Sequence, residues 1–452
     1  MGAAADAQSN GFQLEWRSSS PWALAAIARE SILYGNEFRF RPITENSIRR
    51  LINEFNNVYD QGPGGFQAGN TLAAIFYEQF PYQESLFEEI SRTRALLIDT
   101  RLERENEISD AEWEGLLGAP LDEVIGATFI LNVGAAINNG RFDPAWLDMP
   151  HFQEVFTIAS RQSIERTLER LTATVPDAKA DGLAAPRLPE HLAKYSYNPL
   201  SKTPFILLPG LVPIAPQPRL IMRTSTPGGL YYAGLRQWDQ AFTRELGAKV
   251  EAYVGRQLES QGDLEIYPEV AWGRPEQKSV DWFVVTDDAV ILIECKSGRL
   301  PLAARAGADS LTESLRREIG KAYNQIGRTV ETLRESRAEF SHLPSDRKFI
   351  GLVVTAEPFY GANSQFTRPD LPTISIPTLT LSLRNLEHLV SLDSDTLIQS
   401  IIRIAEDPEL SKWEFGASLG EVLGDNRRPV RNKILDDAWA AYSWVNSSTF
   451  SG

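Results

Sequence analysis

Two acids and a lysine bracket a pair of short apolar runs near the middle of this chain. Asp281 opens the first run, and Glu294 and Lys296 close the second, within the sequence SVDWFVVTDDAVILIECKSGRL of residues 279–300. Carboxylates beside an ammonium group can hold a divalent metal ion and assist the attack of water on a substrate. This chemistry requires the three side chains to share one face, so the local structure of the segment decides whether it is available.

The segment has the pattern of a β-hairpin. Both runs are rich in Val and Ile, and only Asp287-Asp288 separates them, which is typical of two strands joined by a two-residue turn. We predict strands over 280–286 and 289–296. Counting back from the turn, Asp281 faces Glu294, and the Cβ atoms of such a pair lie about 4.5–5.5 Å apart. Alternation places Lys296 on the face of Glu294 and the Cys295 side chain on the other face.

The predicted pairing has an electrostatic consequence. Two carboxylates this close repel each other and lose water, which raises the pKa of at least one of them. A divalent cation removes the repulsion, and Mg²⁺ prefers carboxylate and carbonyl oxygens. A purely structural hairpin gains nothing from the arrangement, although a structural salt-bridge cluster remains an open alternative.

The whole chain limits the class of protein. Its 452 residues suggest two or three domains, and its 42% hydrophobic and 23% charged residues are typical of a soluble globular protein. The longest apolar stretch, 126–137, is well short of the roughly 20 residues of a membrane span, so we expect no membrane partner. The N-terminus lacks the features of a signal peptide and there is one cysteine, which favours the cytoplasm. No GxxxxGK[ST] sequence, and so no nucleotide-binding motif of this kind, is present.

Charge is distributed unevenly along the chain. The net charge of −15 argues against nucleic-acid binding, because phosphate contacts come from Lys and Arg. However, residues 296–348 contain 11 Lys and Arg against 7 Asp and Glu, a local charge of +4. Much of the acidity lies before Gly115. A DNA-binding C-terminal half is therefore compatible with the composition.

The elements around the hairpin predict an α/β fold with a mixed sheet flanked by helices, preceded by a mostly α-helical N-terminal domain. Helical patterns cover 235–261 and 311–337, and strand patterns cover 264–272, 348–355 and 374–383. The predicted regions are a disordered tail (1–10), an α-helical targeting, partner or regulatory domain (11–195), a Pro-rich linker with short extended pieces (196–234), the domain that carries the hairpin (235–405) and a C-terminal helical extension (406–452).

The order of these elements resembles the PD-(D/E)xK nuclease superfamily, which has the restriction-endonuclease-like fold. The resemblance covers about 235–390: a helix with Glu251, then three strands with Asp281 opening the second and Glu294-x-Lys296 closing the third, then a helix and a strand. The superfamily's proline before the aspartate is replaced by Val280, in one of the looser parts of the motif.

The resemblance implies a role for each site residue. Asp281 and Glu294 would bind Mg²⁺ or Mn²⁺, helped by the main-chain carbonyl of Cys295. Lys296 would orient or deprotonate the attacking water and stabilise the developing charge. Glu251 would be a further ligand or a base, although a glutamate in an amphipathic helix is usually only solvated.

The long helix predicted over 311–337 carries a polar face. Arg317, Lys321, Gln325 and Arg328 recur on one side of this helix. The resemblance implies that such residues point to the active site or to the DNA backbone, and a solvated face is the alternative. A stricter pattern known within the superfamily, Gln followed four residues later by Tyr, is not met because Thr329 stands there.

Together these features predict a cytoplasmic, Mg²⁺-dependent endodeoxyribonuclease that hydrolyses DNA phosphodiester bonds, in antiviral (phage) defence, restriction or repair. The N-terminal helical domain would hold a protein partner or form a homo-oligomer. The alternative is a catalytically inactive nuclease fold that serves as a binding or scaffold subunit of such a complex. An RNase using the same residues is a weaker alternative.

Overall fold

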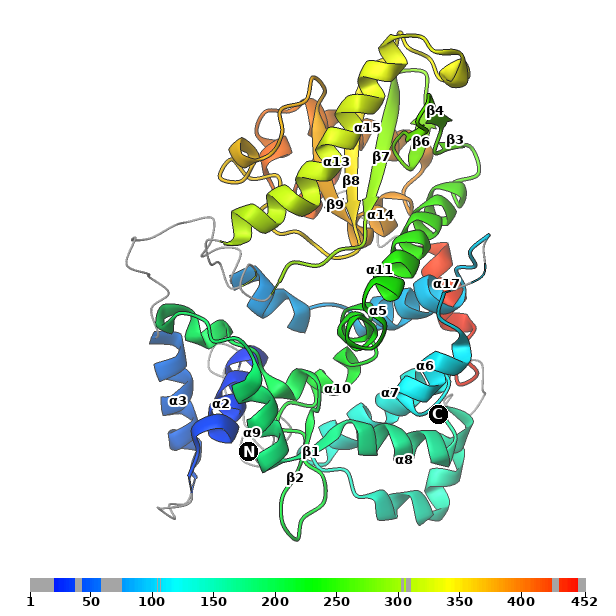
Figure 1. The fold of residues 1–452 in the computed structure, drawn as a ribbon. Coiled ribbons are helices and arrows are strands. Elements are labelled where there is room, and N and C mark those ends of the chain that lie inside the picture. The colour runs from blue at the N-terminus through cyan, green and yellow to red at the C-terminus, as the bar shows by residue number, and fades with distance from the viewer. Residues whose placement is uncertain are drawn as a thin grey trace.

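The computed structural model confirms a mixed α/β protein that is mostly helical, with helices in the N-terminal half and a five-stranded mixed sheet in the C-terminal half (Figure 1). The structure describes residues 20–36, 43–57, 75–103, 105, 107–301, 305, 310–424 and 431–445. The predicted tail 1–10 lies outside these residues.

The sheet combines an antiparallel and a parallel half. Its strand order is β3-β6-β7-β8-β9, in which β3, β6 and β7 pair antiparallel and β7, β8 and β9 pair parallel. The central strand β7 is the longest apolar run of the hairpin, as expected for a strand buried on both faces. The strands are β3 (Glu265–Pro268), β6 (Trp282–Val285), β7 (Ala289–Lys296), β8 (Lys348–Thr355) and β9 (Thr378–Ser382).

Two long helices, α11 (Pro227–Glu259) and α13 (Ser310–Arg334), pack against opposite faces of this sheet. Side chains alternate along each strand, so Val284 and Ile293 join the buried cluster that contains α11, whereas Phe283 and Leu292 join the one that contains α13. Figure 1 shows α13 running across the sheet, with α11 between the sheet and the N-terminal helices. The predicted helix–sheet layers are therefore present.

Helix α11 begins earlier than the predicted start at residue 235. Thr226 caps it, its Oγ1 accepting a hydrogen bond from the Gly229 N–H at 3.3 Å, and Pro227 occupies the first turn. This start signal outweighs the two glycines that follow, so residues 227–234 belong to the helix and not to a linker. Asp239, with φ 43° and ψ −112°, interrupts the helix and divides it into two pieces.

The predicted strand over 264–272 is two short strands with different partners. β3 pairs with β6, whereas β4 (Ala271–Trp272) pairs with β5 (Gln277–Lys278) in a separate hairpin. Pro268 ends β3, and a proline has no N–H to donate to a neighbouring strand. This break places Glu269 at the junction of the two hairpins.

In the described part of the N-terminal half, the regular elements are helices and one small parallel pair of strands. The chain forms a 3-10 helix over Pro150–Thr157 and becomes α-helical only after Ser160, which caps α8. The elements are α2 (Pro21–Tyr34), α3 (Glu45–Asn57), α5 (Leu86–Thr93), α6 (Asp110–Leu117), α7 (Leu121–Ile137), α8 (Arg161–Arg170), β1 (Thr172–Thr174), α9 (Val175–Ala184), β2 (Phe205–Leu207) and α10 (Arg219–Arg223).

One apolar segment, 110–137, is long enough and apolar enough to cross a membrane by length and composition alone. Gly118, with φ 85°, ends α6, and Pro120 precedes α7, so the segment is two helices. Half of its apolar window is buried inside the protein. Ile125 and Leu131 of α7 belong to a buried cluster, which is how the core helix of a folded domain behaves.

The C-terminal helices complete the core on the α11 side of the sheet. Ile401 and Phe415 pack there, together with Leu96 and Trp113 from the N-terminal half. The two halves of the chain therefore share one hydrophobic cluster. The helices are α14 (Leu383–Leu389), α15 (Ser394–Glu406), α16 (Phe415–Leu423) and α17 (Lys433–Ala440).

A buried ion pair joins the same two halves. Arg92 of α5 donates two hydrogen bonds to the carboxylate of Glu387 in α14, at 2.8 and 2.5 Å, and both side chains are almost fully buried. The Tyr253 hydroxyl of α11 donates to the same carboxylate at 2.8 Å. This bidentate pair fixes the orientation of α5 against the helices that cover the sheet.

Candidate functional site

The hairpin of β6 and β7 has the predicted register. Trp282 faces Ile293 and Phe283 faces Leu292, and the turn closes with a hydrogen bond from the Thr286 N–H to the Ala289 carbonyl at 2.9 Å. The next position beyond Trp282 is Asp281, which therefore lies opposite Glu294. The Cys295 side chain packs in the cluster on the α11 side, on the face away from Glu294, as predicted.

Asp281 lies one residue before β6 and is held by the end of β7. Its Oδ2 accepts a hydrogen bond from the main-chain N–H of Cys295 at 2.6 Å. Burial raises the pKa of Asp281 above its ordinary value, although this hydrogen bond and the ammonium group of Lys296 act in the opposite direction. The bond fixes the carboxyl beside the strand that carries the other two predicted residues.

Helix α13 positions the segment that leads into Asp281. The Gln325 amide donates to the carbonyls of Lys278 and Ser279, at 2.6 and 2.7 Å. One turn later, Thr329 Oγ1 accepts a hydrogen bond from the Val280 N–H at 3.2 Å. The threonine at the position where a tyrosine would meet the stricter pattern thus has an identifiable structural role.

Glu294 is the most enclosed carboxylate of the group, with only 6% of its surface exposed. Its Oε1 accepts a hydrogen bond from Lys296 Nζ at 2.5 Å, whereas its Oε2 is buried and has no hydrogen-bond partner among the described residues. Burial, and then repulsion by Asp281, raise the pKa of Glu294 to about 8, against the opposing effect of Lys296. Without a cation, this pair of carboxyls therefore retains a proton at neutral pH.

Glu251 approaches the group from α11. The Trp282 indole N–H donates to the Glu251 carbonyl at 3.0 Å, which attaches this turn of α11 to the start of β6. Burial, followed by the charges of Asp281 and Glu269, raises the pKa of Glu251 to about 7. The structure therefore brings the other three predicted catalytic residues, Glu294, Lys296 and Glu251, within electrostatic reach of Asp281, although Glu251 comes from the helix on the other face.

Glu269 is a fifth member of this group that the sequence did not indicate. Glu269 follows Pro268, which faces Trp282 of β6, and its charge is among the causes that raise the pKa of Asp281, Glu294 and Glu251. Lys278 Nζ donates to Glu269 Oε1 at 2.7 Å. The sequence could have indicated Glu269 only if it had shown that β3 pairs with β6.

The four polar residues predicted to share one side of α13 differ in exposure: Arg317, Lys321 and Arg328 are exposed, and Gln325 is half-buried. Arg317 pairs with Glu318 at 2.9 Å, Lys321 is exposed, and Arg328 donates to the Gln325 amide oxygen. The Gln325 amide nitrogen is already bonded to main-chain carbonyls, so its observed role is structural. Contact of these four residues with DNA remains a prediction.

The chemistry of the acids suits a hard divalent cation, because they offer carboxylate oxygens. As they stand, no three His, Cys, Asp or Glu side chains converge closely enough to enclose a metal ion in the part of the chain that the structure describes. Instead, Lys296 lies against Glu294 and Lys278 against Glu269. Cation binding therefore requires these carboxylates to turn away from the lysines. The role of the Cys295 carbonyl stays a prediction.

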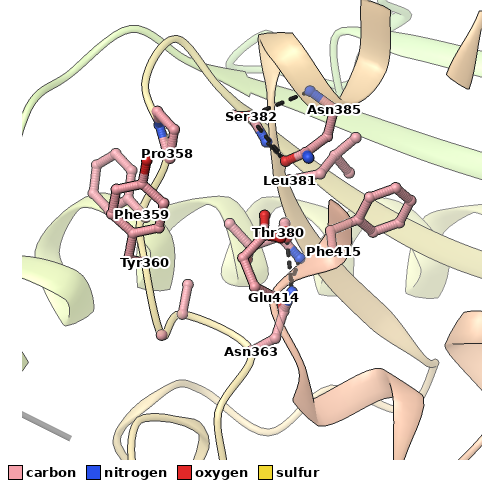
Figure 2. A pocket seen from close by; sticks show the side chains of 12 residues that line it. Pro358, Phe359, Tyr360, Asn363, Thr380, Leu381, Ser382, Asn385, Glu414 and Phe415 are labelled. Atoms are coloured by element: carbon pink, nitrogen blue, oxygen red, sulfur yellow. Dashed lines mark hydrogen bonds between the residues drawn. The ribbon is translucent and has the colours of Figure 1, made fainter. Parts of the chain in front are cut away.

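A pocket at the edge of the sheet is lined by polar groups that mostly bond within the protein, although the buried Thr380 Oγ1 has no hydrogen-bond partner among the described residues. Figure 2 shows Asn363 paired with the main chain of Thr380, through two hydrogen bonds of 2.8 Å. Ser382 and Asn385 bond each other at the start of α14. None of the predicted site residues lines this pocket. Its lining consists of Pro358, Phe359, Tyr360, Gly361, Ala362, Asn363, Thr380, Leu381, Ser382, Asn385, Glu414 and Phe415. The carboxylate group is accordingly the stronger candidate site.

Comparisons with models of protein families, with curated proteins and with solved structures find no match for this chain.

Proposed function

We propose that this protein is a metal-dependent nuclease that hydrolyses DNA phosphodiester bonds. The observation that carries the proposal is the facing pair Asp281 and Glu294, with a buried, unpaired carboxylate oxygen and Lys296 beside them. A buried carboxylate oxygen without a partner is costly unless a ligand satisfies it. The element order α11, β3, β6, β7, α13, β8 supports a restriction-endonuclease-like fold for this half of the chain.

Each side chain has a role that its contacts support. Asp281 and Glu294 would hold Mg²⁺ or Mn²⁺; when bound, the ion polarises the scissile phosphate and lowers the pKa of bound water. Lys296, released when Glu294 turns toward the cation, would orient the attacking water and stabilise charge on the phosphate. Glu251, whose pKa of about 7 lets it accept or donate a proton near neutral pH, is the candidate base.

The exposed side of α13 would position the substrate. Arg317, Lys321 and Arg328 offer positive charge to phosphates on the helix that also holds the segment before Asp281. Such contacts position a nucleic acid without reading its sequence. The resemblance described above supports DNA as the substrate. It also supports a role in antiviral defence, restriction or repair, in the cytoplasm.

A non-enzymatic binding or scaffold role is the second candidate. It is favoured by the two lysines, Lys278 and Lys296, which already lie against acids of the group. In such a protein the acids would be part of a structural charge cluster, and DNA would be bound without being cleaved.

The decisive experiment is a cleavage assay on plasmid, linear and single-stranded DNA and on RNA, with Mg²⁺ or Mn²⁺ and with EDTA. Asp281→Asn and Lys296→Met should each lower metal-dependent cleavage by at least about a hundredfold, because each removes a group that acts directly in the reaction. Glu251→Gln should lower it as well.

Glu259→Gln is the matched control for Glu251→Gln, because Glu259 is an exposed glutamate two turns further along α11. It should leave cleavage unchanged. Cleavage that survives both Asp281→Asn and Lys296→Met would refute the assignment of the site. A folded wild-type protein that binds DNA but cleaves no substrate with either metal would favour the scaffold role, and cleavage of RNA alone would make the protein an RNase.

A further inference from the structure

We propose that Tyr232, Arg299 and Arg305 form a platform that binds an unpaired DNA strand beside the candidate site, with a base on the Tyr232 ring and a phosphate on Arg305. The inference deepens the proposed function and rests on it for the nucleic acid. It names single-stranded DNA as the form of the substrate that this part of the protein holds.

The platform is attached to the carboxyl end of β7 by two segments of chain. Arg299 follows Lys296 by three residues, and a chain of this length spans at most about 11 Å. The Lys296 carbonyl also accepts a hydrogen bond from the Ala356 N–H at 2.8 Å, and the next residue, Glu357, binds both arginines. A strand held on the platform would therefore lie close to Lys296.

The ion pairs of the platform contain more positive than negative charge. Arg299 and Arg305 share the single carboxylate of Glu357: Arg299 contacts both of its oxygens, and Arg305 Nη2 lies 3.1 Å from one of them. The Glu318 carboxylate, which approaches the same turn of chain, is paired with Arg317 at 2.9 Å. Within these pairs one guanidinium charge is uncompensated, and a phosphate group would complement it.

Arg305 has a donor to spare for such a phosphate. Its Nε donates to the Leu300 carbonyl at 2.9 Å and its Nη2 to Glu357, but its Nη1 makes no hydrogen bond within the described part of the chain. Arg299, in contrast, uses Nε and Nη2 on Glu357 and Nη1 on the Gly228 carbonyl. Arg299 therefore holds the cluster together, and Arg305 can contact a phosphate.

Tyr232 of α11 offers an exposed aromatic surface to a base. Its ring centroid lies 4.7 Å from the guanidinium carbon of Arg299 and 5.7 Å from that of Arg305, yet 41% of the residue is exposed. Tyr231 meets this ring edge-on, with 5.5 Å between the ring centroids. These contacts fix the ring in place. An exposed aromatic ring beside cationic groups is the combination that binds single strands.

The aromatic surface favours an unpaired base over a base pair. Within a duplex the faces of each base are covered by its neighbours in the stack, so a ring on the protein surface stacks only on a base that has left the helix. Phosphate contacts alone would serve duplex and single strand alike. Tyr232 therefore predicts a preference for single-stranded DNA.

The test measures binding of a short fluorescent oligothymidylate by anisotropy, with the full-length protein in EDTA so that metal-dependent cleavage is suppressed. Tyr232→Leu should weaken binding about fivefold or more, which is the effect of losing one stacked base, whereas Tyr232→Phe keeps the ring and should bind like the wild type. A hairpin duplex of the same length should bind more weakly than the oligothymidylate, and Tyr232→Leu should leave its binding unchanged.

Salt dependence tests the phosphate contact separately. Arg305→Gln should weaken binding of the oligothymidylate and reduce the slope of log affinity against log salt concentration by about 0.7, the value for one phosphate contact on a single strand. Arg305→Lys keeps the charge and should retain most of this slope. Tyr34→Leu is the matched control for Tyr232→Leu, because Tyr34 is an exposed tyrosine of α2; it should bind like the wild type.

Wild-type affinity for the oligothymidylate in Tyr232→Leu would overturn the inference. Failure of the wild-type protein to bind the oligothymidylate, or tighter binding of the duplex, would overturn it as well. Binding in the expected order by a protein that cleaves no substrate would support the inference and refute the proposed function. Cleavage by a wild-type protein whose Tyr232→Leu variant binds the single strand normally would do the reverse.

Discussion

At the scale of single residues, Glu294 carries a carboxyl group whose surroundings oppose its charge. Burial and the neighbouring Asp281 favour the protonated form, and Lys296 only partly compensates. A folded protein tolerates such a group when function requires it, because the cost is met by the rest of the structure. The cost itself can be measured without any substrate.

Glu294→Gln should stabilise the protein at alkaline pH in EDTA. The folded-state pKa of Glu294 is about 8, above its ordinary value of 4.5, so the folded chain keeps a proton that the unfolded chain releases between these values. Stability therefore falls as pH rises through this window, by an amount on the order of a few kcal/mol. Glutamine cannot ionise and avoids this loss.

Urea unfolding at pH 5 and pH 8.5 tests this effect. The variant should match the wild type at pH 5 and exceed it at pH 8.5, and Mg²⁺ should reduce the difference by stabilising the wild type alone. A variant that is less stable than the wild type at both pH values would contradict the raised pKa.

At the scale of elements, the hairpin could be predicted from the sequence because its signals are local. Alternation and the turn Asp287-Asp288 fix the register, and hence the pairing of Asp281 with Glu294. The pairing of β3 with β6 could not be predicted, because neither segment contains a local sequence signal for its partner strand. Glu269 was missed for this reason, and the start of α11 was missed because Pro227 followed by two glycines also suits a loop.

Gln325→Ala should lower the free energy of unfolding by about 1–2 kcal/mol, because two main-chain carbonyls lose their hydrogen bonds. It should also lower cleavage, since the segment that leads into Asp281 keeps only the Thr329 hydrogen bond to α13. Lys321→Ala, one turn earlier and exposed, is the control and should change stability by less than about 0.5 kcal/mol.

Urea unfolding and a DNA-binding titration separate the two roles. If Gln325 only positions the site, its alanine variant should bind DNA as tightly as the wild type, while Lys321→Ala binds more weakly. Unchanged stability in Gln325→Ala would contradict the structural role.

At the scale of the whole molecule, the two halves of the chain are joined by a shared apolar cluster and by the buried pair Arg92–Glu387. The sequence predicted separate regions because their patterns differ, with helices before the proline-rich stretch and an α/β pattern after it. Contacts between residues almost three hundred positions apart could not be predicted from local patterns. We therefore expect the N-terminal helices to affect the stability of the sheet.

Arg92→Met should lower the free energy of unfolding by about 3–5 kcal/mol, because it leaves Glu387 and Glu89 as uncompensated buried charges. Arg161→Met is the control: Arg161 also makes two ion pairs, at 2.6 and 2.8 Å, but on the surface, and its loss should cost about 1 kcal/mol or less. Urea unfolding measures both, and equal small effects would show that the buried pair does not join the two halves.

Because the Cys295 main chain is hydrogen-bonded to Asp281, the reactivity of the Cys295 thiol can report on the candidate site. The chain has one cysteine, so a thiol reagent labels only the residue whose main chain holds the key carboxylate. Burial raises the pKa of this thiol, and a protonated, partly buried thiol reacts slowly. The rate of Cys295 alkylation then measures how often the end of β7 opens. Slower alkylation in the presence of Mn²⁺ would show that the ion holds this end of β7 closed, without any substitution in the chain.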